Sequence, residues 1–212
     1  MIRIVVADDH SIVRTGICRL LNAESGFEVV GEADDGNGLL DKCRELAPDV
    51  VIVDFNMPGM DGLDATRRIV QDHPDVRVLV LTMYDSEEFV YRFQQAGAAG
   101  FLPKKVSYEE LPFAVRKVAA GSTYFTSSIS RPGAMAAVET GEQAPSALLS
   151  EREFQVLLRL VRGMALNDIA KELVIGYSTV KTYKNRIMDK LNIYNIPDLT
   201  RYALRMGLIE QL

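Results

Sequence analysis

The sequence contains no tryptophan, two cysteines and two histidines in 212 residues. Cys18 and Cys43 fall on the apolar faces of helical patterns, which favours small core side chains over a disulfide or a metal site. Neither His10 nor His73 lies near a cysteine, so a zinc site is not expected. No apolar run approaches the roughly 20 residues that span a bilayer, and the chain begins with a strand pattern instead of a signal peptide. We expect a cytoplasmic protein without membrane contact.

The charge is divided unevenly along the chain. Hydrophobic residues make up 48% of the sequence, which is enough for one large domain or two ordinary ones. Residues 1–125 hold 13 Lys and Arg against 20 Asp and Glu, a balance of −7, whereas residues 148–212 hold 10 against 7, a balance of +3. The acidic and basic parts therefore differ in kind, and a basic part favours an anionic partner.

Strand-like and helix-like runs alternate five times over residues 1–121. Such alternation predicts an α/β fold, with a doubly wound parallel sheet and helices on both faces. The expected strands are Ile2–Ala7, Phe27–Val30, Val50–Val53, Val76–Leu81 and Gly100–Leu102. The expected helices lie around 13–21, 39–46, 63–72, 87–95 and 108–120.

After Gly121 the composition changes. Residues 127–147 are rich in Ser, Ala, Gly and Pro, which predicts a linker with room for one short helix. Residues 148–212 have helical periodicity alone, beginning with a capping-box signal at Ser150 and Glu153 and a stop at Gly163. Further helices are expected around 167–173, 177–191 and 198–206. We predict domains at 1–121 and 148–212, joined by the linker 122–147.

Five polar residues follow the carboxyl ends of the predicted strands. Asp8 and Asp9 follow the first strand, Asp54 the third, Thr82 the fourth and Lys104 the fifth. In a doubly wound sheet these ends form one rim, where ligands bind. Three neighbouring carboxylates repel unless a cation joins them, and a set of hard oxygen ligands suits Mg²⁺ or Mn²⁺.

The same residues suit phosphoryl transfer. Asp54 stands centrally and is the candidate nucleophile, while a metal ion, Lys104 and Thr82 would stabilise the phosphoryl oxygens. Any one of these residues alone would more simply cap a helix or make a turn. A phosphatase with an aspartyl-phosphate intermediate is an alternative, but it needs a general acid two residues after the nucleophile. That position is Asn56, whose amide cannot donate a proton in this way.

The stretch "LNDIAKELVIGYSTVKTYKNRIMDKLNI" predicts two helices joined by a tight turn at 174–176. The apolar residues of both helices form one seam, as in a helix-turn-helix. Away from the seam, the second helix carries polar and cationic residues that suit bases and phosphates of double-stranded DNA, although a solvated charged face is the simpler interpretation of any single lysine. The DNA-binding candidates are Ser178, Lys181, Thr182, Lys184, Asn185, Arg186 and Lys190.

Several of these stretches resemble known families. "VADDH", "VDFNMPGMDG", "VLVLTMYD" and "AGAAGFLPK" are similar to the receiver domain of two-component response regulators, over about residues 1–121. "LSEREFQVLLRLVRGMALNDIAKEL" and "STVKTYKNRIMDKL" resemble the LuxR-type DNA-binding domain, and the pairing is similar to the NarL/FixJ class. "TYKNRIMDKLNI" looks closest to the GacA/UvrY and BvgA/EvgA groups. The resemblance implies a flavodoxin-like (βα)5 receiver followed by a four-helix, all-α domain.

The resemblance also implies roles for residues at the rim. Asp54 would accept phosphate from the phosphohistidine of a sensor histidine kinase. Asp9, Asp54 and the backbone carbonyl of Asn56 would ligate Mg²⁺, with Asp8 acting through water. Thr82 and Phe101 would form the switch, with Phe101 turning inward on phosphorylation in the place of the commoner Tyr.

Besides Phe101, one more departure from the family pattern lies at this rim. Pro103 precedes Lys104 and Lys105 follows it, whereas the family often has Lys followed by Pro; we assign the phosphate contact to Lys104. Asn56 and Tyr84 would flank the phosphate, and we hypothesise that they set its rate of hydrolysis. Apart from this self-directed chemistry, we expect no enzyme activity.

The last predicted helix places Leu199, Tyr202, Ala203 and Met206 on one face. Periodicity alone predicts core packing. In LuxR-type domains the corresponding helix contributes to a homodimer on DNA. A phosphorelay or protein-sequestering regulator, whose helical domain binds protein, is the alternative function, and a receiver that signals without phosphorylation is a third.

Overall fold

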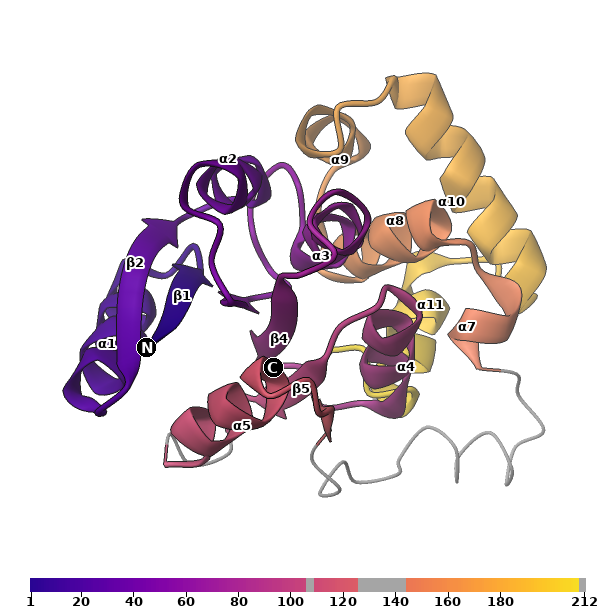
Figure 1. The fold of residues 1–212 in the computed structure, drawn as a ribbon. Coiled ribbons are helices and arrows are strands. Elements are labelled where there is room, and N and C mark those ends of the chain that lie inside the picture. Colours follow the sequence, from indigo (N-terminus) through magenta and orange to yellow (C-terminus); the bar gives the residue numbers. More distant parts are fainter. Residues whose placement is uncertain (106–108, 126–143, 210–212) are drawn as a thin grey trace. The chain divides into compact units, whose positions relative to one another are not determined.

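The structure is a computed structural model that describes residues 1–105, 109–125 and 144–209. The chain divides into two compact units, one of Met1–Met83 with Arg92–Ser128 and one of Tyr84–Tyr91 with Ile129–Leu212. Figure 1 colours the elements along the sequence.

The first unit is built on a six-stranded parallel sheet in the order β2-β1-β3-β4-β5-β6. This order confirms the predicted doubly wound α/β fold. β6 was not predicted: it is a strand of two residues that pairs with β5 and lies within the expected linker. The strands are β1 Ile2–Ala7, β2 Phe27–Ala33, β3 Val50–Val53, β4 Arg77–Thr82, β5 Gly100–Pro103 and β6 Tyr124–Phe125.

Helices cover both faces of this sheet. α2 (Gly36–Leu46) and α3 (Gly62–Asp72) lie on one face, and α1 (Ser11–Ala23) and α5 (Glu110–Ala119) lie on the other (Figure 1). All four residues of β3 are buried, as expected for a strand covered on both sides. α4 spans Glu87–Gln95, and its residues 87–91 belong to the second unit. The expected start of α5 at Tyr108 lies outside the described residues.

Alternate residues of the strands build the core on the face of the sheet that α1 and α5 cover. In β1, Ile4 and Val6 pack with Ile17 and Leu21 of α1 and with Val115 of α5 in one apolar cluster. The alternation follows from the period of two residues along a strand. Burial of the strands fixes their register, and the register in turn brings their carboxyl ends to a common rim.

The second unit is helical, as predicted. The capping box is confirmed, because the Ser150 hydroxyl accepts a hydrogen bond from the Glu153 amide and the Glu153 carboxylate accepts one from the Ser150 amide. A short helix, α7, lies at the end of the expected linker. The helices are α7 Pro145–Leu148, α8 Glu151–Val161, α9 Leu166–Glu172, α10 Tyr177–Leu191 and α11 Ile196–Arg205.

A tight turn joins α9 to α10. Val174 adopts a left-handed conformation with φ 54°, which is unfavourable for a β-branched residue, and its side chain is 86% exposed. The Ile175 amide donates a hydrogen bond to the Ala170 carbonyl, which closes the end of α9. Ile169 of α9 and Val180 and Ile187 of α10 are fully buried, so the helices meet along the predicted seam.

Among the helices of the described residues, none is both long enough and apolar enough to cross a membrane.

Candidate functional site

The backbone of the first unit aligns the strand ends at one rim. The Asp54 amide donates to the carbonyl of Ala7 at 2.9 Å, which places the acids that follow β1 and β3 side by side. The Lys104 amide donates to the carbonyl of Thr82 at 2.7 Å, which does the same for the ends of β4 and β5. The predicted gathering of the rim residues therefore follows from the sheet itself.

Lys104 joins two of the three acids. Its Nζ lies 2.7 Å from Oδ2 of Asp8 and 2.9 Å from Oδ2 of Asp54. The three side chains are only 6%, 2% and 4% exposed, so the interaction is largely shielded from water. Of the two neighbouring lysines, Lys104 contacts the acids, whereas Lys105 is exposed.

Burial and charge act against each other at this cluster. Burial raises the pKa of Asp54, the charge of Lys104 opposes the rise, and the nearby Asp8 adds to it. Burial alone would lower the pKa of Lys104, but Asp54 and Asp8 outweigh it and raise this pKa above its ordinary value. Lys104 therefore remains an ammonium ion that balances the acids.

A buried oxygen and the surrounding carboxylates fit a divalent cation. Oδ1 of Asp54 is buried and has no hydrogen-bond partner among the described residues, and an orphaned polar atom of this kind calls for a ligand. Asp8, Asp9, His10 and Asp54 each offer a ligand atom, and these atoms lie within 4.8 Å of one another. The carboxylates suit Mg²⁺ or Mn²⁺. His10, which follows Asp8 and Asp9 directly, was not among the predicted metal ligands.

Thr82 and Phe101 are both fully buried. The ring of Phe101 lies 5.9 Å from that of Phe93, which in turn lies 6.0 Å from the ring of Phe55. The inward orientation that we expected only after phosphorylation is thus already present. The switch role of Phe101 stays a prediction, and any change at this ring must start from the inward position.

Gly62 supports the loop after Asp54 and was missed as a site residue. Its amide donates to the carbonyl of Phe55 at 2.9 Å. A Cβ atom at this position would lie 2.1 Å from the carbonyl oxygen of Asp54, closer than any side chain allows. Glycine is therefore required where α3 begins beneath the phosphoacceptor candidate. The only signal in the sequence was its place in "MPGMDG".

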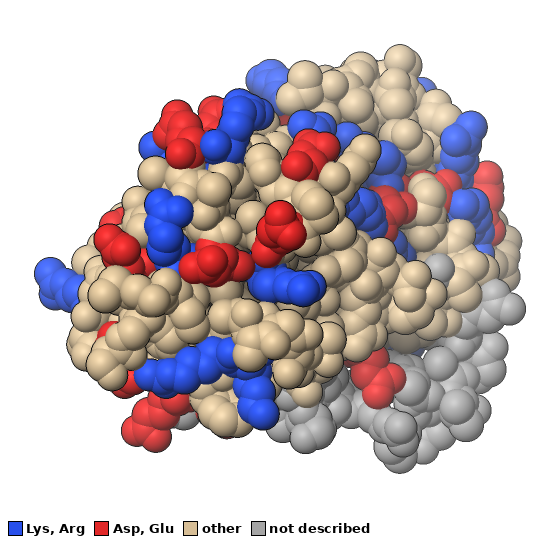
Figure 2. All heavy atoms as spheres, in the orientation of Figure 1, with Lys and Arg blue, Asp and Glu red and all other residues tan. Residues whose placement is uncertain are grey.

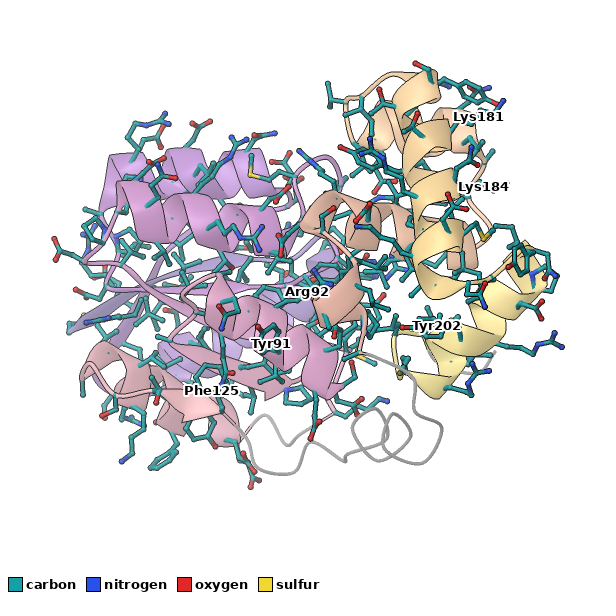
Figure 3. The ribbon with its side chains drawn as sticks, turned by 90° about the vertical axis from the view of Figure 1, so that its right-hand side faces the viewer. Tyr91, Arg92, Phe125, Lys181, Lys184 and Tyr202 are labelled. Atoms are coloured by element: carbon teal, nitrogen blue, oxygen red, sulfur yellow. The ribbon has the colours of Figure 1, made fainter. Side chains whose placement is uncertain are left out.

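The second candidate site is the solvent face of α10. Ser178, Lys181, Thr182, Asn185 and Arg186 are exposed, as predicted. Ser178, Thr182 and Arg186 also line a shallow pocket on this face. Figure 2 shows cationic side chains over the region of α10, and Figure 3 labels Lys181 and Lys184 on this helix.

The cations of α10 fall into two groups. Within the described residues, Lys181, Lys184 and Arg186 form no ion pair. Lys190 differs, because its Nζ lies 2.7 Å from Oε2 of the buried Glu153 on α8. The predicted phosphate contact at Lys190 thus competes with a structural partner that the sequence pattern did not reveal.

All four apolar residues expected at the dimer face of α11 are buried. Leu199 and Ala203 have no exposed surface, and Tyr202 and Met206 are 4% and 3% exposed. Figure 3 labels Tyr202. Their burial agrees with the core packing that periodicity predicted, and it leaves little of these side chains for contact with a second copy.

The chain matches two known protein families. Residues 4–116 match the response regulator receiver domain, and residues 147–203 match the luxR family of bacterial regulatory proteins. The response regulator GacA of Pseudomonas viridiflava is 41% identical over 211 residues, covering 99% of each chain. The response regulator UvrY of Escherichia coli K12 is 40% identical over 209 residues, covering 98% of this chain and 96% of UvrY.

Solved structures of the response regulator RcsB are also similar. RcsB of Salmonella typhimurium superposes with a TM-score of 0.78 at 27% identity, covering 97% of this chain and 98% of RcsB. RcsB bound to the promoter rprA in the presence of the phosphomimetic BeF₃⁻ gives 0.71 at 27% identity, covering 95% and 97%. A structure of two RcsB dimers on two parallel DNAs gives 0.59 at 26% identity, covering 96% and 98%.

The two family matches cover the parallel sheet and the helix-turn-helix, and GacA and UvrY match over nearly the whole chain. The chain belongs to the two-component response regulators of the NarL/FixJ class, with a receiver domain and a LuxR-type DNA-binding domain.

Proposed function

We propose that Asp54 accepts a phosphoryl group from the phosphohistidine of a sensor histidine kinase and that this modification controls DNA binding by the helical domain. The observation that carries the proposal is the position of Lys104, whose ammonium group contacts the carboxylates of Asp8 and Asp54 in a buried site. A cation held beside a buried carboxylate is the arrangement that phosphoryl transfer needs, because negative charge develops on the transferred group.

The transfer itself is a displacement at phosphorus. An oxygen of Asp54 forms the new P–O bond as the P–N bond to the kinase histidine breaks, and the imidazole nitrogen keeps the electron pair. Lys104 then exchanges its contact with the Asp54 carboxylate for one with a phosphoryl oxygen, and the Thr82 hydroxyl donates to another. The chain carries out this transfer and the later hydrolysis only on itself, without turnover of an external substrate.

The residues around Asp54 would hold Mg²⁺. Asp9, Asp54 and the backbone carbonyl of Asn56 would ligate it directly, and Asp8 would act through water. When bound, the ion neutralises charge on the transferred group and orients it for in-line displacement. Asn56 and Tyr84 would tune the hydrolysis of the phosphate, a role that the dephosphorylation rates of Asn56→Ala and Tyr84→Ala would test.

Phosphorylation acts by favouring one of two conformations of the receiver. We propose that movement of Thr82 toward the phosphate repacks the residues around Phe101 and alters the surface near α4 and β5. A phosphate shifts this equilibrium only by its difference in affinity for the two states. The functional division would be a receiver over 1–121, a linker over 122–147 and a DNA-binding domain over 148–212, with β6 adding a short edge strand to the receiver sheet.

The helical domain would bind double-stranded DNA through α10. Lys181, Thr182 and Asn185 are the candidates for base contacts, with Lys184 and Arg186 on phosphates. RcsB is described on promoter DNA and as dimers on DNA, which supports a homodimer as the DNA-binding form of this cytoplasmic regulator. Because the four apolar residues of α11 are buried, such a dimer would depend more on the exposed side chains next to them.

Intact-mass measurement tests the first step of the proposal. The full chain is incubated with Mg²⁺ and acetyl phosphate, and one added phosphate is expected in the wild type. Asp54→Asn should take up none, whereas Asp41→Asn, an exposed acid on α2, should behave like the wild type. Equal uptake by Asp54→Asn would overturn the assignment.

Salt-dependent DNA binding tests the second step. A steep fall in affinity with salt is expected, because contacts to phosphates release counterions. Asp54 phosphorylation without affinity for any duplex would instead support the alternative in which the helical domain binds a protein.

A further inference from the structure

His10 turns its side chain toward the acidic rim. It occupies the N-cap position of α1, but its side chain makes no capping hydrogen bond. Instead, Nδ1 lies 2.7 Å from Oδ1 of Asp9 and 3.4 Å from Oδ1 of Asp8. The His10 amide donates to the same Asp8 oxygen at 2.9 Å, so the backbone holds the residue against the acids.

Lys104 and His10 approach different carboxylate oxygens of the rim. Lys104 contacts Oδ2 of Asp8 and Oδ2 of Asp54. The oxygens that Nδ1 of His10 approaches are Oδ1 of Asp8 and Asp9, and Oδ1 of Asp54 is buried without a hydrogen-bond partner among the described residues. A metal ion that shares the rim with Lys104 therefore has these Oδ1 atoms and the imidazole nitrogen at hand.

The spacing of the ligand atoms suits a small octahedral ion. Two adjacent ligands at about 2.1 Å from such an ion lie about 3 Å apart. The distances of 2.7 Å and 3.4 Å from Nδ1 to the oxygens of Asp9 and Asp8 lie on either side of this value. Oxygen ligands serve Mg²⁺ well, whereas an imidazole nitrogen favours divalent transition-metal ions.

We infer that His10 is a ligand of the receiver's metal site and biases that site away from Mg²⁺ toward divalent transition-metal ions such as Mn²⁺. The inference rests on the proposed function, because it requires the acids at the rim to bind a divalent cation. It adds a nitrogen donor to a site that the acids alone would make purely of oxygen. The side chain is 61% exposed, so an ion can reach it without unfolding of α1.

Pulsed electron paramagnetic resonance with Mn²⁺ as the probe tests direct ligation in the full chain. The expected spectrum of the wild type has the ¹⁴N modulation of a directly bound imidazole, and His10→Ala should lose it. His73→Ala is the matched control, because His73 is the only other histidine in the sequence and should leave the signal unchanged. Bound Mn²⁺ without imidazole modulation in the wild type would overturn the inference while leaving an oxygen-only site intact.

Calorimetric titration with Mn²⁺ and Mg²⁺ gives a second readout. In His10→Ala the preference for Mn²⁺ over Mg²⁺ should fall about tenfold, since changes around a metal ligand commonly alter affinity by that much or more. An unchanged preference would contradict the role of His10. If neither ion bound the wild type, the metal site of the proposed function would be contradicted as well. Asp9→Asn should weaken the binding of both ions at the rim, so this variant distinguishes the site from adventitious binding elsewhere.

Discussion

The rim of the receiver and the solvent face of α10 differ in how their charged groups are held. At the rim, Lys104 is 6% exposed and lies against Asp8 and Asp54. On α10, Lys181 and Arg186 are exposed and form no ion pair among the described residues. The receiver site is therefore prearranged by the fold for one small ligand, whereas the cations of α10 acquire partners only when an anionic surface arrives.

Replacing the phosphoacceptor candidate Asp54 should have the largest effect, because it removes the reaction for which the receiver site is prearranged. Asp54→Asn retains the size of the side chain and removes the nucleophilic charge, so phosphorylation should be lost altogether. DNA affinity of Asp54→Asn should then stay constant on incubation with acetyl phosphate. Phosphate that appears on another residue and still raises affinity would show that the prearranged rim is not the switch.

Gly62→Ala tests whether the loop after Asp54 is as constrained as the buried rim suggests. The added Cβ would lie 2.1 Å from the Asp54 carbonyl oxygen, so the backbone must move. We expect a loss of about 1–3 kcal/mol in the free energy of unfolding, together with slower phosphorylation.

Gly16→Ala is the matched control for that substitution. A Cβ on Gly16 in α1 would meet no atom within 4 Å, so this change should be neutral or stabilise the helix slightly. Calorimetry of the full-length variants gives the comparison. Equal stability of Gly62→Ala and Gly16→Ala would contradict the close approach beneath Asp54.

Substitutions on α10 test the exposed site. Asn185→Ala should cost about 1–3 kcal/mol in binding to a specific duplex and relax specificity at one base pair, if Asn185 contacts a base edge. Lys184→Ala should weaken binding to all duplexes and reduce the salt slope by about 1. Lys42→Ala changes the net charge equally but lies on α2 of the receiver, so it should leave the salt slope unchanged.

The ion pair of Glu153 and Lys190 joins a buried acid to a partly exposed cation. It is therefore intermediate between the buried rim of the receiver and the exposed cations of α10. Burial raises the pKa of Glu153, but hydrogen bonds from Lys190 and Ser150 outweigh it and lower this pKa below the ordinary value. The carboxylate therefore contributes stability above the ordinary Glu pKa of about 4.3, and this contribution is lost as the pH falls through the lower, folded pKa.

Glu153→Gln should cost about 1–2 kcal/mol at neutral pH, since Lys190 is 41% exposed and water screens the pair. Amide exchange in α8 and α10 reports the change locally, and the difference from wild type should shrink toward acid. Lys190→Met should show a similar effect, whereas Lys181→Met on the same helix should not. A difference that stays constant with pH would contradict the role of the ionised pair.

The smallest expected effect is at the turn between α9 and α10. Val174 is exposed and left-handed, so Val174→Gly should relieve strain and raise stability by about 0.5–1 kcal/mol. Val174→Ala retains a Cβ and should not give the same gain. Thermal unfolding of both variants measures whether Val174→Gly alone raises the stability.

The sequence predicted what depends on local patterns. Buried strands, a capping box and the alternation of elements follow from periodicity and turn residues, and the rim follows from strand order. Long-range pairs left no such pattern: Lys190 and Glu153 are 37 residues apart, and periodicity placed Lys190 among the DNA contacts. β6 was missed because two residues carry no period, and the clash at Gly62 depends on a backbone approach in three dimensions.

The most direct test of the account measures phosphate content and DNA affinity in the same samples of wild type and Asp54→Asn. After incubation with Mg²⁺ and acetyl phosphate, the wild type should gain one phosphate and bind a duplex more tightly, with an affinity that falls steeply with salt. Asp54→Asn should change in neither respect. If the wild type gained the phosphate at Asp54 and its affinity for every duplex tested stayed the same, the proposed coupling of receiver to DNA-binding domain would be contradicted.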